Sequence, residues 1–208
     1  MTQPSPTFIG QDRKRRCSWC SSDPLYVAYH DNEWGRPVTD DNRLYEKLCL
    51  EGFQAGLSWL TILKKREAFR EAFAGFDPLI VARFTTRDVQ RLMRNAGIVR
   101  NTAKIQATIS NARATIKVWD AGLTLSEVIW KHQPTKRRAA PRAYGDVPSF
   151  SAESTALSKE LSRLGFRFVG PTTMYAAMQS LGIVNDHYAS CAFRSACDSG
   201  RSKLARGR

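Results

Sequence analysis

The chain has 208 residues, of which 42% are hydrophobic and 25% are charged. This composition provides enough apolar surface for one globular unit, or for two small lobes that share an interface, and it excludes extensive disorder. The apolar runs, such as residues 79–82, are too short to span a membrane, and residues 1–10 lack the sustained hydrophobic core of a secretory signal. We therefore expect a cytoplasmic protein, and we expect it to be a monomer.

Positive charge is the next feature of the chain. Lysine and arginine number 32 against 19 aspartates and glutamates, which gives a formal net charge of +13. A surplus of this size attracts polyanions, so nucleic acid is the expected partner, although solubility or binding to acidic lipid would also account for it. The cysteines are five, an odd number, and this favours metal binding or free thiols over a disulfide framework.

Both ends of the chain are polar and basic. Residues 1–16 finish in the run Arg13–Arg16, and residues 193–208 contain further lysines and arginines. Such segments are typical of mobile arms. We predict a flexible arm over 1–16, a folded unit over 17–192 and a flexible tail over 193–208.

The interior of the chain is dominated by helical patterns. Apolar residues recur at helical spacing from Trp59 to Phe73, and Gly75 follows where a helix should end. Asp77 and Pro78 have the form of a helix cap and a first-turn proline. Further helices are predicted over about 105–119, 157–164 and 172–181, whereas residues 131–148 are predicted to be a surface loop.

A capping box is also expected, formed by Thr124 and Glu127 at the start of a short helix. Strand-like alternation is nearly absent, and one extended segment at residues 166–169 cannot make a sheet. The predicted fold class is therefore all-α.

Residues 89–118 are similar to a helix-hairpin-helix module. A short helical pattern over 89–95 is followed by a glycine-containing turn, and Asn101 or Thr102 can cap the next helix. In such modules, backbone N–H groups of the hairpin point at a DNA phosphate. The residues expected to contact DNA are Gly97, Ile98, Val99 and Arg100. Helix–glycine–helix turns are also common packing devices, so this pattern alone is weak.

Many base-excision enzymes share this module, and those that use Schiff-base chemistry carry a lysine early in its second helix. In this chain Asn101 falls near that position, and Lys104 lies about one turn further. We therefore expect either simple hydrolysis without a lyase step or no catalysis.

Four residues are candidate zinc ligands, namely Cys17, His30, His187 and Cys191. The last two are four residues apart, which would place them on one face of a helix, and Asp186 can cap that turn. An alternative set replaces His30 with Cys20, because Cys17 and Cys20 form a common zinc half-site. A third possibility is that all of them are ordinary buried side chains.

Several motifs resemble those of the 3-methyladenine DNA glycosylase I family. They are Cys17–Trp19, Asp23–Tyr26, Tyr29–Gly35, Leu50–Trp59, Ala96–Ile98, Phe168–Gly170 and Val184–His187. The similarity spans about residues 17–192. It implies the helix-hairpin-helix glycosylase fold, with a zinc-binding region that joins the two ends of the chain, and one structural zinc ion on Cys17, His30, His187 and Cys191.

The resemblance also implies a base-binding pocket. It assigns Glu51 to this pocket together with Tyr29 and Trp59, and it places Trp19 and Tyr26 nearby. Another group, Gln54, Gly56 and Leu57, falls in a loop that would act as a wedge where the base leaves the duplex. We assign Glu51 first to recognition of the base; whether it also orients the attacking water stays open.

The implied activity is hydrolytic release of 3-methyladenine from double-stranded DNA that contains alkylated adenine. One alternative is a catalytically inactive, zinc-containing module that only binds damaged DNA. Retention of Glu51, Tyr29 and Trp59 argues against it, because a phosphate-binding module needs no purine pocket. A nucleobase deaminase is disfavoured because the His-x-Glu and Pro-Cys-x-x-Cys arrangement is missing.

Overall fold

The computed structural model describes residues 5–206, which form two compact units. The helical unit comprises residues 39–132 and 150–177. The terminal unit takes its described residues from 5–38, 133–149 and 178–206, so it contains both ends of the chain. None of the helices in the described range is long and apolar enough to cross a membrane.

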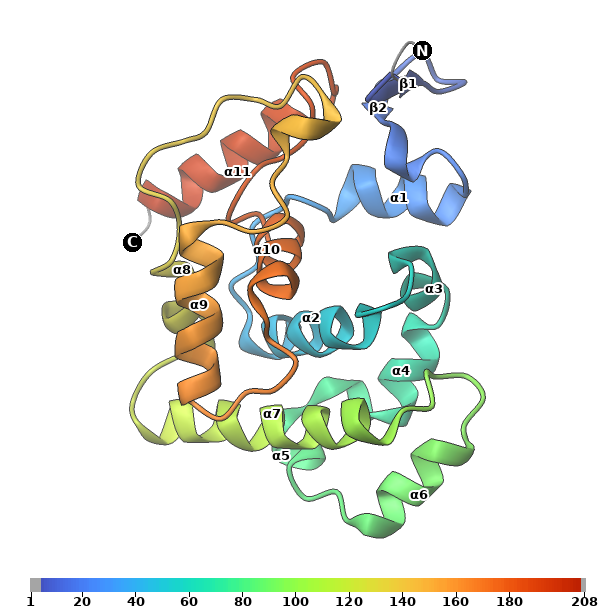
Figure 1. Ribbon diagram of the computed structural model, residues 1–208, viewed down its shortest axis with the longest axis vertical. Coiled ribbons are helices and arrows are strands. Elements are labelled where there is room, and N and C mark those ends of the chain that lie inside the picture. The colour runs from blue at the N-terminus through green and yellow to red at the C-terminus, as the bar shows by residue number, and fades with distance from the viewer. Residues whose placement is uncertain (1–4, 207–208) are drawn as a thin grey trace. The chain divides into compact units, whose positions relative to one another are not determined.

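The helical unit is a set of short helices around one long one. Its elements are α2 (Asp41–Gln54), α3 (Trp59–Lys64), α4 (Arg66–Ala72), η2 (Ala74–Phe76), α5 (Pro78–Val81), α6 (Thr86–Arg94), α7 (Thr102–Asp120), α8 (Leu125–Trp130) and α9 (Ala152–Arg163). The helix α10 (Pro171–Ser180) begins in this unit and ends in the other. The long helix α7, yellow-green in Figure 1, contacts α2, α5, α6 and α8.

Aromatic side chains fill the core of the helical unit. Phe53 of α2 lies against Phe69 of α4, with ring centroids 4.6 Å apart, and Phe69, Phe73 and Phe76 continue the stack. Each of these rings is at most 1% exposed. Burial of one such side chain contributes roughly 1.5–3 kcal/mol, so this cluster is a major source of the unit's stability.

The predicted helix ends of this unit are largely confirmed. The Asp77 side chain accepts from the Leu79 N–H at the start of α5, and Asn101 accepts from the Lys104 N–H at the start of α7. Thr124 forms the predicted capping box that opens α8. Gly75 has a φ of 67°, a backbone conformation that favours glycine, at the point where the preceding helix ends.

The terminal unit contains a small sheet. Strands β1 (Thr7–Ile9) and β2 (Arg15–Cys17) pair antiparallel, with Thr7 opposite Cys17, and η1 (Ser18–Cys20) and α1 (Pro24–Asn32) follow. From the later segments come η3 (Tyr144–Asp146) and α11 (Arg194–Arg206). The all-α prediction is thus confirmed as mostly helical, with this hairpin as the exception (Figure 1).

The segments predicted to be a flexible arm (1–16) and a flexible tail (193–208) contain β1, part of β2 and α11 in their described residues. Arg16 is only 5% exposed, because it donates hydrogen bonds to both Asp12 and Asp31. In the tail, α11 buries Cys197 and Arg201. The basic runs therefore fold because partners elsewhere in the terminal unit neutralise or cover part of their charge.

A buried lysine fixes the C-terminal end of α2. The side chain of Lys104, on α7, is 9% exposed, and its Nζ donates to the carbonyl oxygens of Phe53, at 2.8 Å, and Ala55, at 2.6 Å. The last carbonyls of a helix lack partners within the helix and favour a nearby cation. Burial lowers the pKa of Lys104. Lys104 is therefore a positioning residue beneath the helix that carries Glu51.

We expect the Lys104→Met variant to lose about 2–3 kcal/mol of unfolding free energy, because two carbonyl groups lose a charged donor. Denaturant unfolding followed by circular dichroism measures this loss. The matched control is Lys117→Met, at an exposed position of the same helix, which should change stability by about 0.5 kcal/mol or less. Equal losses in the two variants would contradict the role given to Lys104.

Candidate functional site

Four metal-ligating side chains meet in the terminal unit. Cys17 ends β2, His30 lies on α1, and His187 and Cys191 lie in the segment before α11. All four are buried, and their ligand atoms lie within 4.8 Å of one another. We call these residues the four-donor group.

Three distances within the four-donor group match those of a tetrahedral site. The Cys191 Sγ lies 3.5 Å from the His30 Nε2 and 3.4 Å from the His187 Nδ1, and the Cys17 Sγ lies 3.6 Å from the same His187 atom. A tetrahedral zinc ion with sulfur at about 2.3 Å and nitrogen at about 2.0 Å places such donors roughly 3.5 Å apart. The donor types and their spacing therefore both fit a closed zinc site.

Each histidine is oriented by a second hydrogen bond. The His30 Nδ1 lies 2.8 Å from Asp31 Oδ1, and the His187 Nε2 lies 3.2 Å from the Trp34 carbonyl oxygen. These contacts turn the opposite ring nitrogens toward the thiols, as is usual for metal-bound histidines. Sequence reasoning missed Asp31; the only local signal is a carboxylate directly after a candidate ligand.

The two thiols of the group affect each other. Hydrogen bonding between them raises the pKa of Cys17 and lowers the pKa of Cys191. In this arrangement one sulfur carries the proton and the other accepts it. A divalent cation would stabilise both as thiolates, which is the form that binds metal.

Cys20 is not part of the four-donor group, although it was the rival of His30. Its Sγ donates to the Cys17 carbonyl oxygen at 3.1 Å, and burial raises its pKa to about 12. The Cys20 thiol is thus directed at a backbone oxygen. Among the described residues, the group that could hold a metal contains His30 in its place.

The expectation that His187 and Cys191 share one face of a helix is wrong. Residues 185–191 contain no helix, and residues 188–191 close a turn in which the Cys191 N–H donates to the Tyr188 carbonyl oxygen at 2.8 Å. Just before this turn, the Asn185 Oδ1 accepts from the His187 N–H at 3.2 Å. A tight turn and a helix both bring residues four apart together, so the spacing alone did not distinguish them.

An aromatic cluster lies beside the four-donor group. The Trp19 ring lies 4.9 Å from Tyr26 and from Trp34 and 5.3 Å from His30, measured between centroids. Tyr29 lies 6.4 Å from Tyr26 and is 5% exposed. The structure thus brings Trp19, Tyr26 and Tyr29 together and packs Trp19 against His30 of the four-donor group.

The other two predicted base-binding residues belong to the helical unit. Glu51 lies within α2 and is only 4% exposed, so it is not an ordinary helix-end residue on the surface. Trp59 begins α3, whose N-terminus is capped by the Ser58 side chain. The Lys47 Nζ lies 4.7 Å from the centroid of the Trp59 ring.

Lys47 is a further candidate residue that sequence reasoning missed. It is 2% exposed and precedes Glu51 by four residues on α2, so both side chains lie on the same face of the helix. A buried lysine one turn before a buried glutamate was the available signal. The cation contributes positive charge at the face of Trp59.

Of the predicted wedge residues, Gln54 ends α2, and Gly56 and Leu57 lie in the loop that connects α2 to α3. Gly56 has a φ of 82°, and the Gln54 Nε2 donates to the Leu57 carbonyl oxygen at 2.9 Å. The Leu57 side chain is 39% exposed. The loop thus presents an apolar side chain to solvent. Its backbone is held by Lys104, whose Nζ donates to the Ala55 carbonyl oxygen.

The predicted hairpin joins α6 to α7, but its glycine has a different role from the one expected. Gly97 does not adopt a left-handed backbone; instead, a Cβ at this position would lie 2.9 Å from the Ala68 Cβ. Its N–H donates to the Asn95 Oδ1 at 2.8 Å, and Ile98 is buried at 2% exposure. Gly97 and Ile98 therefore serve packing.

The two residues after Ile98 have backbone N–H groups that remain available for binding. Within residues 5–206, the N–H groups of Val99 and Arg100 have no recorded acceptor, and the Arg100 side chain is exposed. They directly precede the N-terminus of α7, which carries partial positive charge. This part of the hairpin can bind an anion.

Known proteins share this sequence and this fold. Residues 19–195 match the family model described as methyladenine glycosylase. The chain is 50% identical to the DNA-3-methyladenine glycosylase 1 of Escherichia coli (strain K12) over 179 residues, which cover 85% of this chain and 95% of that protein.

Two solved structures agree with this match. A crystal structure of 3-methyladenine DNA glycosylase I has a TM-score of 0.83 at 47% identity and covers 85% of this chain and 98% of its own. The Staphylococcus aureus 3-methyladenine DNA glycosylase I, whose structure concerns recognition of 3-methyladenine, has a TM-score of 0.82 at 36% identity, with 86% and 96% covered. Since sequence and fold agree over nearly the whole length of these relatives, the chain belongs to the methyladenine glycosylase family.

Proposed function

We propose that this chain is a DNA glycosylase that releases 3-methyladenine from alkylated DNA by hydrolysis. The observation that carries the proposal is its match, over nearly their full length, to proteins named for this activity. The buried carboxylate of Glu51 and the aromatic residues of the predicted pocket support it further.

The chemistry demands little acid–base assistance. An adenine methylated at N3 carries a delocalised positive charge, so the bond between its N9 and the deoxyribose C1′ is already weak. When that bond breaks, its electron pair goes to the base, which leaves as neutral 3-methyladenine. Water then adds its oxygen to C1′ and gives one proton to solvent. The harder task is rejection of normal adenine, which has almost the same outline.

Glu51 is assigned to that discrimination. Its carboxylate accepts hydrogen bonds from the edge of the adenine and stabilises the positive charge of the lesion. Burial strengthens both effects, because the local dielectric constant is lower than that of water. Tyr29 and Trp59 are assigned to stacking on the electron-poor purine, and Trp19 and Tyr26 to supporting them. Leu57 is assigned to filling the space that the extruded base leaves.

A lyase step is not part of the proposal. Lys104, the lysine nearest the start of α7, already donates to two carbonyl oxygens and holds the end of α2. Hydrolysis by water therefore fits this chain better than attack by an amine.

The Glu51→Gln variant should fold and bind DNA, but release 3-methyladenine roughly ten- to a hundredfold more slowly, because it loses the negative charge and one acceptor. Single-turnover release of free base from methylated duplex DNA measures this change. The control is Glu71→Gln, at an exposed position of α4, which should retain full activity. An unchanged rate in a folded Glu51→Gln would remove Glu51 from the site, and a wild-type chain that binds this DNA but releases no base would leave only the damage-binding alternative.

We further propose that the four-donor group holds one structural zinc ion. Two thiolates and two imidazoles leave a tetrahedral ion no open position, so the ion would supply stability and no catalytic water. Its ligands come from both ends of the chain. It would thus hold the segment that carries Trp19 against the segment that precedes α11.

Loss of a zinc ligand should release the ion and visibly destabilise the terminal unit, since structural zinc contributes roughly 10–16 kcal/mol in small peptides. We expect purified His30→Ala to contain far less than one zinc per chain and to melt at a lower temperature. Cys20→Ser should keep the metal, because its thiol donates to a carbonyl oxygen instead. Metal analysis with calorimetry tests both; zinc retained by His30→Ala but lost by Cys20→Ser would reverse the assignment.

We also propose that the hairpin holds the DNA backbone through the N–H groups of Val99 and Arg100 and the Arg100 side chain. Such contacts position the enzyme without reading bases. Gly97→Val is a poor test of this role, because any added Cβ collides with Ala68.

If Arg100 neutralises one phosphate, Arg100→Ala should lower the slope of log affinity against log salt by about 0.9, equally for damaged and undamaged duplex. Arg163→Ala, at an exposed position near the end of α9, is the matched control. Fluorescence anisotropy across a salt series measures the slope, and binding of free 3-methyladenine reports an intact pocket. If Arg100→Ala weakened binding of the free base as much as binding of DNA, the hairpin would be supporting the fold.

A further inference from the structure

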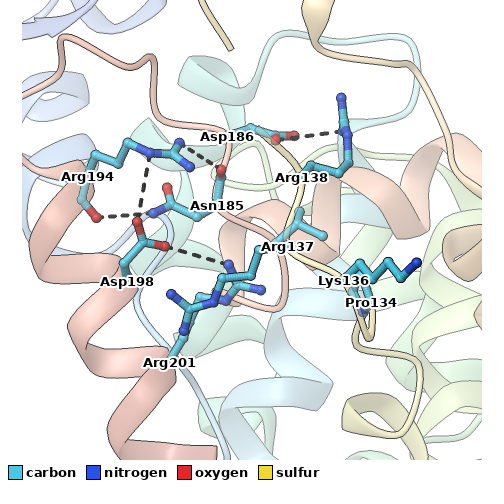
Figure 2. Close-up of a pocket in the computed structure, with 10 residues that line it drawn as sticks. Pro134, Lys136, Arg137, Arg138, Asn185, Asp186, Arg194, Asp198 and Arg201 are labelled. Atoms are coloured by element: carbon cyan, nitrogen blue, oxygen red, sulfur yellow. Dashed lines mark hydrogen bonds and ion pairs between the residues drawn. The ribbon is translucent and has the colours of Figure 1, made fainter. Parts of the chain in front are cut away.

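A cavity of about 50 Å³ lies within the terminal unit, apart from the four-donor group. One wall is the loop of residues 133–149 and the other is α11, with residues 184–186 between them, as Figure 2 shows. The family match ends at residue 195, so most of the α11 wall lies outside it. We call this space the arginine cavity.

The lining of the arginine cavity has a surplus of positive charge. Lys136, Arg137, Arg138, Arg194 and Arg201 line it, against two carboxylates, Asp186 and Asp198. The excess is three positive charges. A metal cation is therefore an unsuitable occupant, whereas an anion would be attracted.

Among the basic residues of this lining, Arg201 is the buried one. It is 6% exposed, and its Nη2 donates to the Ile183 carbonyl oxygen at 2.8 Å. Its Nε has no hydrogen-bond acceptor in the part of the chain that the structure describes. A buried guanidinium with an unused donor costs free energy unless a further acceptor is supplied.

The acidic residue nearest to Arg201 does not supply this acceptor. Asp198 lies 3.8 Å from both the Arg201 Nη1 and the Arg194 Nε, which is too long for a hydrogen bond. Arg137, which donates to the Ser202 Oγ at 2.8 Å, brings a second positive charge toward Arg201. Burial, followed by this like charge, lowers the pKa of Arg201. An anion between the guanidinium groups of Arg137 and Arg201 would offset the burial of the Arg201 charge and the repulsion between the two groups.

We propose that the arginine cavity binds one oxyanion of the phosphate class. Arginine forks suit tetrahedral oxyanions, because each offers several N–H donors to oxygens that share the charge. The volume accommodates a few water molecules or one small ion, but no purine base. The bound anion would join the loop of residues 133–149 to α11. Its source is either free inorganic phosphate or a phosphate of the DNA backbone.

Isothermal titration of the purified, full-length protein with inorganic phosphate, at constant ionic strength in a phosphate-free buffer, tests the site. We expect saturable binding of one phosphate per chain. Arg137→Met and Arg201→Met should each weaken it about tenfold or more, since each removes charged donors. Arg87→Met, at an exposed position of α6, should leave it unchanged.

The Arg137→Met variant keeps the test decisive if Arg201→Met fails to fold, because Arg137 is exposed. Absence of saturable binding to the wild-type chain, or affinity unchanged in a folded Arg137→Met, would overturn the proposal. Addition of undamaged duplex DNA distinguishes the two sources. Displacement of bound phosphate, seen by phosphorus NMR, assigns the cavity to the DNA backbone, and its retention assigns the cavity to free phosphate. Neither result depends on glycosylase activity.

Discussion

The meeting of two thiols and two imidazoles in the terminal unit is the constraint on which the rest of that unit depends. Cys17 and His30 come from its first segment and His187 and Cys191 from its last. Around them pack aromatic side chains from both segments, including Trp19 and Phe193. The terminal unit has a small apolar core at this point. Polar contacts, and contacts among the four donors, therefore contribute more to its stability than such contacts do in the helical unit.

The helical unit follows a different physical principle. Its aromatic core is nearly completely buried, and a few polar side chains fix its helices at their ends. Lys104 holds the end of α2, and the Asp41 carboxylate, at the start of α2, accepts from Trp119 of α7 and from two backbone N–H groups at the start of α8. The consequence is a rigid α2. The recognition role that we propose for Glu51 requires such a rigid support, because hydrogen bonds to a base tolerate little displacement.

Sequence patterns predicted the helix caps and the apolar helix faces, which depend on residues close together in the chain. The caps at Asp77, Asn101 and Thr124 could be read from the chain because each side chain bonds to an N–H two or three residues further on. The long apolar stripe of α7 was equally visible. The four candidate donors were proposed from residue type and spacing, with Cys20 as an alternative to His30 that the family resemblance disfavours, and the structure brings the four together. The pocket residues rest on the resemblance alone and stay a prediction.

Long-range partners explain what the sequence did not reveal. Arg16 reads as part of a solvated basic run, since nothing local shows that Asp31 will cover it. Lys104 was rejected as a nucleophile, but its carbonyl partners lie about fifty residues earlier. Gly97 was expected to contact DNA, whereas the structure shows that the proximity of Ala68 leaves no room for a side chain at this position. In each case the missing information was which distant residue lies opposite.

The order of the donors along the chain has a consequence for biosynthesis. His187 follows His30 by 157 residues, and the whole helical unit is encoded between them. At translation rates of about 5–20 residues per second, the second pair of donors is made roughly 8–30 s after the first. The helical unit can form its core during this interval, while the complete donor set cannot exist. A nascent chain that stops before Cys191 carries Glu51 but lacks one of the four donors, so the four-donor group can form only after Cys191 has been made.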